Sequence, residues 1–167
     1  MAQVFVALAF MAVAFMALAS MMAAAPAAAQ DYARGYVAYK HGDYAAALKE
    51  FRPLAAQGRG SAQYFLGEMY AEGLGVKRDY AQAVKWYRKA VVQRVAFAQI
   101  KLGLMYRRGK GVPQDNILAY MWYSMGARRG LRLGKNYLRR IATIMTEEEI
   151  AEARYRARRW RKKHKEY

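Results

Sequence analysis

The chain of 167 residues has no cysteine, and it has only two histidines and three prolines. Without cysteine it has no disulfide framework, no thiolate zinc site and no thiol nucleophile. Charge is also missing from one end, because residues 1–30 contain no Asp, Glu, Lys or Arg. The rest of the chain is long enough for one domain with a hydrophobic core. Its many aromatic residues argue against disorder.

The uncharged end is an apolar run that is long enough to cross a bilayer, which takes about 20 residues. A break at Pro26 and a run of alanines follow it. Small residues in an A-x-A pattern are typical of a signal-peptidase site. We therefore expect residues 1–29 to be a signal peptide that is cut after Ala29, and the alternative is an uncleaved inner-membrane anchor. Both interpretations predict that the charged part of the chain is exported. A cleaved protein would be periplasmic or secreted, and an uncleaved one would be anchored in the inner membrane.

Residues 59–94 and 95–130 are an internal repeat, since 13 of their 36 aligned positions are identical. In the first unit, apolar residues follow a helical spacing up to Gly73, a position that favours left-handed backbone at a helix end. Asp79 and Asp115 are placed to accept hydrogen bonds from the first free amides of a second helix. Each unit is therefore predicted to be a pair of helices. Gly67 lacks a Cβ atom, so we expect a neighbouring helix to approach it closely.

Weaker copies of the pattern flank the two units. Residues 31–58 predict a tetratricopeptide-like first helix pair with a shorter loop, in which Pro53 kinks or frames the second helix. Residues 131–163 predict a degenerate capping helix pair, whose last helix follows a capping box from Thr146 to Glu149. Residues 164–167 are then the end of a basic tail. The predicted fold class is all-α, a right-handed α/α solenoid of helix pairs.

The two central units resemble Sel1-like repeats, which are relatives of the tetratricopeptide repeat. The resemblance rests on the A-Q, L-G-x-M-Y, G-x-G-V-x-x-D and W-Y elements of AQYFLGEMYAEGLGVKRDYAQAVKWYRKA and AQIKLGLMYRRGKGVPQDNILAYMWYSMGA. It covers residues 61–130 closely, and residues 31–58 and 131–160 more loosely. It implies an adaptor or scaffold that binds other proteins, often in bacterial envelope or secretion settings. It implies no catalytic residues.

The positions shared by the two units are explained most simply as architecture, because each unit must stack on the next. We therefore expect Trp86, Trp122, Tyr70 and Tyr106 to lie in the core. Function is expected where the first helices of the two units differ, since first helices line the inner curve in stacks of this type. The candidate partner-binding residues are Tyr64, Phe65, Glu68, Glu72, Lys101, Leu104, Arg107 and Arg108.

Positive charge accumulates toward the C-terminus. The formal net charge of +17 is divided into +1 for residues 31–58, +4 and +5 for the two repeats, and +7 for residues 131–167. Four interpretations are open for the basic end: contact with an anionic membrane or cell-wall polymer, contact with an acidic protein, nucleic-acid binding, and a solvated helix face. Export argues against nucleic acid. The candidate polyanion-binding residues are Arg154, Arg156, Arg158, Arg159, Arg161, Lys162, Lys163 and Lys165.

No catalytic or metal-binding motif accompanies these features. His41 and His164 are far apart in sequence, and neither lies in a metal-binding motif. The sequence therefore predicts no enzyme, no cofactor, no metal and no small-molecule substrate. We expect a non-catalytic scaffold that mediates protein–protein interaction through its inner helical surface. The alternative is a protein that tethers to the envelope through its basic C-terminal helix, and a cell-wall hydrolase is disfavoured because no catalytic constellation is present.

Overall fold

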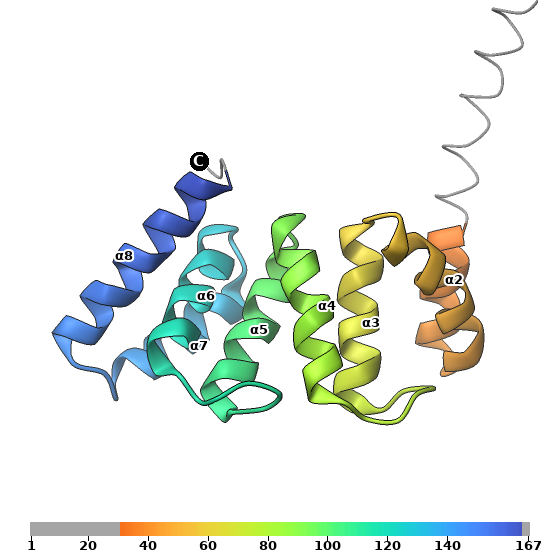
Figure 1. Ribbon diagram of the computed structural model, residues 1–167, viewed down its shortest axis with the longest axis horizontal. Coiled ribbons are helices and arrows are strands. Elements are labelled where there is room, and N and C mark those ends of the chain that lie inside the picture. The colour runs from red at the N-terminus through yellow and green to blue at the C-terminus, as the bar shows by residue number, and fades with distance from the viewer. Residues whose placement is uncertain (1–30, 165–167) are drawn as a thin grey trace, which may run out of the picture. The chain divides into compact units, whose positions relative to one another are not determined.

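The computed structural model describes residues 31–164, which form helices joined by short turns (Figure 1). The chain divides into two compact units, Met1–Glu50 and Phe51–Tyr167. In the first unit residues 31–40 are helical, and α2 (Tyr44–Ala56) begins there and continues into the second. The second unit contains α3 (Gly60–Glu72), α4 (Tyr80–Val92), α5 (Ala96–Arg108), α6 (Asn116–Arg128), α7 (Arg132–Ala142) and α8 (Glu147–Lys163).

The described part of the chain is all-α, and the prediction of a solenoid of helix pairs is confirmed. No helix within residues 31–164 combines the length and the apolar character that a membrane span requires. The predicted signal peptide lies outside the described residues, as does the end of the basic tail from Lys165 onward.

The second helices of the repeats, α4 and α6, begin directly after the aspartates that the sequence analysis predicted as N-caps. The Asp79 side chain accepts a hydrogen bond from the Gln82 amide at 3.0 Å, and Asp115 accepts one from the Leu118 amide at 2.8 Å. Each carboxylate satisfies an amide that has no partner inside the helix, which stabilises the helix start. The predicted N-caps are therefore confirmed.

The first helices of the repeats, α3 and α5, each end at a glycine. Gly73 and Gly109 both adopt a left-handed backbone, with φ of 75° and 63°. At the other end of the unit, the predicted capping box joins Thr146 and Glu149, and α8 starts at Glu147 as the sequence indicates. These boundaries are set locally, by residues within a few positions of each helix end.

Two glycines allow the helices of each repeat to pack closely. A Cβ atom on Gly67 would lie 2.5 Å from Cε1 of Tyr87, and one on Gly103 would lie 2.7 Å from Cδ1 of Tyr123. Both tyrosines are almost completely buried. The predicted close approach at Gly67 is therefore confirmed, and the ring that fills the space is the tyrosine of the W-Y element.

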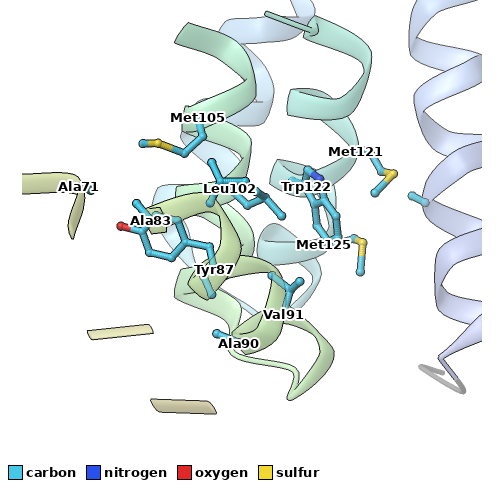
Figure 2. Packing of buried hydrophobic residues seen from close by; sticks show 13 residues of the cluster. Ala71, Ala83, Tyr87, Ala90, Val91, Leu102, Met105, Met121, Trp122 and Met125 are labelled. Atoms are coloured by element: carbon cyan, nitrogen blue, oxygen red, sulfur yellow. The ribbon is translucent and has the colours of Figure 1, made fainter. Parts of the chain in front are cut away.

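One core cluster runs through the second unit from α3 to α8 (Figure 2). Tyr87, Val91 and Leu102 lie at its centre, while Met121, Trp122 and Met125 lie on the side of α6 that faces α8. Its buried members are Ala71, Ala83, Val84, Tyr87, Ala90, Val91, Ala98, Leu102, Met105, Met121, Trp122, Met125 and Ala157. The repeats thus share one continuous apolar interior, as stacking of repeat units requires.

Three of the four aromatic residues expected in the core are only partly buried. Trp122 is buried, but Trp86, Tyr70 and Tyr106 are partly exposed. The Nζ atom of Lys89 lies 4.4 Å from the centre of the Trp86 ring, which is a cation–π contact at the rim of the core. Tyr70 and Tyr106 nevertheless pack against the core cluster, so the expectation holds in part for them, whereas Trp86 is not among the residues of that cluster.

The capping pair does not pack like the two repeats. In the repeats, α3 packs on α4 and α5 packs on α6, whereas α7 and α8 both pack mainly against α6. Figure 1 shows α8 inclined to the preceding helices. Trp160 of α8 makes an edge-to-face contact with Trp122 of α6, with ring centres 5.4 Å apart. This arrangement leaves a cavity among α6, α7 and α8.

Candidate protein-binding groove and basic helix

A groove lies between the first helices α5 and α7. Its walls contain three of the predicted partner-binding residues, Leu104, Arg107 and Arg108, all from α5. The other lining residues are Tyr123, Tyr137, Arg140, Ile141, Thr143 and Ile144. The cavity measures about 580 Å³. It therefore combines three guanidinium groups with an aromatic and aliphatic surface.

The aromatic wall of this groove is a stacked pair of tyrosine rings. Tyr123 and Tyr137 stack with ring centres 5.2 Å apart. Burial raises the pKa of the Tyr123 hydroxyl, and Arg108 and Arg107 oppose this shift through their positive charge. Both guanidinium groups are therefore close enough to affect a charge at the groove wall.

The predicted residues on α3 occupy different surroundings. Phe65 stacks on Phe51 with ring centres 5.1 Å apart, and Tyr64 contacts Phe65 at 5.2 Å. Tyr64 also packs near Phe97 at 6.2 Å. Glu72 is exposed and does not line the groove. Tyr64 and Phe65 thus form a half-buried aromatic row, separate from the residues that line the groove.

Glu68 lies inside the fold. Its carboxylate accepts a hydrogen bond from the hydroxyl of Tyr87. It also forms an ion pair with Lys101, whose Nζ lies 2.6 Å from Glu68 Oε2. The residue is 8% exposed. Burial and the negative charge of Glu68 both raise the pKa of Tyr87, so the tyrosine stays neutral and donates its proton. Glu68 and Lys101 therefore hold α3, α4 and α5 together.

The predicted polyanion-binding residues divide between two faces of α8. Arg154, Arg158 and Arg161 line the cavity among α6, α7 and α8. Arg156, Arg159, Lys162 and Lys163 line a shallower cavity of about 760 Å³ together with Met121, Tyr155 and Trp160. Ala153 and Ala157 are buried against the fold between these faces. The basic stretch is thus two surfaces that point in different directions.

The outer face of α8, which carries Arg156, Arg159, Lys162 and Lys163, combines charge with exposed aromatic surface. Tyr155 is 47% exposed, and the Arg159 guanidinium lies 5.7 Å from its ring centre. Arg156 donates a hydrogen bond to Glu152 at 2.7 Å.

Within residues 31–164 no group of three or more His, Asp or Glu side chains is arranged to hold a metal ion.

The Sel1 repeat family model matches residues 60–91 and 96–131, which are the two helix pairs α3–α4 and α5–α6. Two solved structures share the architecture of helix pairs. The chain is a Sel1-like repeat protein. Sel1 repeats generally mediate protein–protein interaction.

One similar structure is a protective antigen from uropathogenic Escherichia coli strains that displays a Sel1-like repeat fold. It is 28% identical with a TM-score of 0.76, over 82% of the present chain and 30% of its own. The other is a Sel1 repeat protein from Oxalobacter formigenes, 33% identical with a TM-score of 0.60, over 62% of the present chain and 43% of its own. This Sel1-like repeat protein thus spans less than half the length of either relative. No curated protein matches it.

Several residues of the groove and cavity of this Sel1-like repeat protein escaped the sequence analysis. Tyr123, Tyr137, Arg140 and Ile144 line the groove, and Arg128 and Lys135 line the cavity beside α8. Tyr123 was assigned to the repeat pattern alone. The Arg139–Arg140 pair was a signal in the sequence, and the predicted stacking put α7 next to α5, but the sequence did not show which side chains of α7 face the groove.

Proposed function

We propose that this protein is a non-catalytic scaffold that holds an acidic segment of a partner protein in the groove between α5 and α7. The observation that carries the proposal is the placement of Arg107, Arg108 and Arg140 around one aromatic and aliphatic groove. Within residues 31–164 no carboxylate forms an ion pair with any of these three arginines. The groove therefore offers unpaired positive charge to a ligand.

The chemistry of the groove suits a protein segment. Arginine and tyrosine are the residue types that are enriched at the energetic centres of protein interfaces. Guanidinium groups bind carboxylates with two parallel hydrogen bonds, and the neighbouring rings accept apolar side chains. We expect the bound segment to place Asp or Glu beside a large apolar residue.

A selection of displayed peptides against the whole protein tests the proposal. We expect enrichment of sequences in which acidic residues neighbour aromatic or aliphatic ones. The double substitution Arg107→Gln and Arg140→Gln should weaken their binding about tenfold or more, since each charged hydrogen bond contributes more than 1 kcal/mol. The control is Arg52→Gln with Arg59→Gln, which removes the same charge from exposed positions outside the groove. Peptides that bind both double variants equally would overturn the assignment to the groove.

We propose that the protein works outside the cytoplasm. The support is the apolar run followed by an A-x-A pattern at residues 27–29. The test is the N-terminal sequence of the mature protein, together with its distribution between periplasmic, membrane and cytoplasmic fractions. A mature chain that begins near Gln30 in the periplasmic fraction or the medium is the expected result. A full-length chain in the cytoplasm would contradict it.

The outer face of α8 supports a second candidate function, in which the protein tethers to an anionic envelope surface. Tyr155 and Trp160 lie among Arg156, Arg159, Lys162 and Lys163 on this face, and aromatic rings with cations are typical of membrane-interface contacts. Substitution of Arg159 and Lys162 by Gln should then release the protein from isolated envelopes at moderate salt. Retention of the variant at wild-type level would count against tethering.

A further inference from the structure

The cavity among α6, α7 and α8 is lined by positive charge from three helices. Arg128 comes from α6, Lys135 from α7, and Arg154, Arg158 and Arg161 from α8. No acidic residue is among its lining residues, and its volume is about 500 Å³. This volume is in the range of small-molecule sites in proteins. Residues that are more than 30 positions apart in the sequence thus converge on one cavity.

Four of these cations form no ion pair within the part of the chain that the structure describes. Within residues 31–164 no carboxylate pairs with Arg128, Lys135, Arg154 or Arg158. On the opposite face of the same helix Arg156 pairs with Glu152 at 2.7 Å. Like charges that surround one cavity repel each other and destabilise the folded chain. An anion in the cavity would remove that repulsion, and its binding would stabilise the protein.

The cavity also has an apolar part. Its remaining surface includes Tyr120, Ala127, Leu138 and Ala157. Tyr120 is 5% exposed and packs in the apolar cluster that joins α6, α7 and α8. Guanidinium and ammonium groups only donate hydrogen bonds. The lining therefore suits a ligand with an acceptor-rich anionic head and a carbon body.

We propose that this cavity is a binding site for a phosphate ester. A phosphate monoester offers three acceptor oxygens and a charge of about −1.5 to −2, which suits several cations around one point. Arginine binds such a group through two parallel hydrogen bonds. A single peptide carboxylate would leave most of these cations unpaired. The phosphate group belongs either to a small soluble ester or to the headgroup of an anionic phospholipid.

This proposal is independent of the peptide-binding groove. The residues that line the cavity and those that line the groove between α5 and α7 have no member in common. A failure of the groove experiment would therefore not contradict the proposed phosphate site. A failure to bind phosphate would likewise not contradict the proposed peptide groove.

Arg154→Gln with Arg158→Gln removes two positive charges from the cavity. The control, Arg52→Gln with Arg59→Gln, removes two charges from exposed positions that line neither this cavity nor the surface around Tyr155 and Trp160. All four residues are exposed, and Gln has a helix propensity close to that of Arg and Lys. Far-UV circular dichroism and thermal unfolding check that both variants fold.

Calorimetric titration of the protein recovered from expression of the full chain measures binding. The probes are inorganic pyrophosphate, glycerol 3-phosphate and the water-soluble dihexanoyl form of phosphatidic acid, a lipid with a phosphate monoester, with tetraglutamate as the acidic peptide. We expect at least one phosphate probe to bind, with a Kd that is about tenfold or more weaker in the cavity variant and within about twofold of wild type in the control. Tighter binding of the lipid than of glycerol 3-phosphate identifies a headgroup as the source, and the reverse order identifies a soluble ester.

Three results would overturn the proposal. The first is the absence of binding by every phosphate probe. The second is equal weakening in both variants, which would mean a diffuse response to net charge. The third is cavity-dependent binding of tetraglutamate alone, which would make the cavity a site for acidic peptides.

Discussion

Lys101 Nζ lies 2.6 Å from Glu68 Oε2, and this ion pair joins the first helices of the two Sel1 repeats. The same carboxylate accepts a hydrogen bond from Tyr87 on α4. Leu104 occupies the corresponding position in the second repeat, so the ion pair occurs once between two otherwise similar units. It is a contact of the interior, where a lost partner leaves a charge that water solvates poorly.

We expect Lys101→Met to destabilise the protein by about 2 kcal/mol, because Glu68 is then buried without its cation. The double substitution Glu68→Leu with Lys101→Met should recover most of this loss, since neither charge remains. Urea denaturation of the two single variants and the double variant measures the coupling between the residues. Additive effects of the two changes would show that the pair contributes little.

Gly67→Ala should destabilise the protein by about 1–3 kcal/mol through overpacking, although alanine is the better helix former by about 1 kcal/mol. The added methyl group would meet the Tyr87 ring, which is fully buried. Glu72→Ala, at an exposed site on the same helix, is the control. A variant that is more stable than wild type would mean that the ring moves aside easily.

Asp115→Ala should cost about 1 kcal/mol of stability, because the Leu118 amide loses its acceptor at the start of α6. Asp115→Asn keeps a side-chain oxygen at the same place and should lose much less. Thermal unfolding at neutral pH compares the two variants. An equal loss for alanine and asparagine would assign the effect to charge instead of to the hydrogen bond.

Stability should fall steeply above pH 10. Burial, with the nearby charge of Glu68, raises the pKa of Tyr87 in the folded protein, while the pKa in the unfolded chain stays near 10. Above that pH the unfolded chain releases a proton that the folded protein keeps, so the free energy of unfolding decreases by up to about 1.4 kcal/mol per pH unit. Below that pH the contribution of Tyr87 is complete and does not vary.

Tyr87→Phe separates this effect from other alkaline titrations. The variant should be less stable at pH 7, because Glu68 loses a hydrogen-bond donor, but its stability should fall less steeply above pH 10. Urea denaturation at several pH values gives both slopes. Parallel slopes for the variant and the wild type would exclude Tyr87 as a source of the alkaline loss.

Much of the fold could be predicted because its signals are local. Asp79, Asp115 and Thr146 act on amides within three residues, and Gly73 fixes the backbone at its own position. The repeat at a fixed spacing then indicated that these helix pairs stack. The burial of Glu68 could not be predicted. Helical spacing does not distinguish an exposed carboxylate from a buried one that pairs with a lysine 33 positions later in the sequence.

The sequence by itself determined the helices, their caps and the repeat, because each depends on residues that are neighbours along the chain. Only the tertiary structure decided that α8 packs on α6, which divides one basic stretch into two faces. It also placed Arg140 opposite Arg107 and Arg108 in one groove. These arrangements depend on which apolar surfaces bury each other, here Trp160 against Trp122, and this choice is made between helices rather than within them.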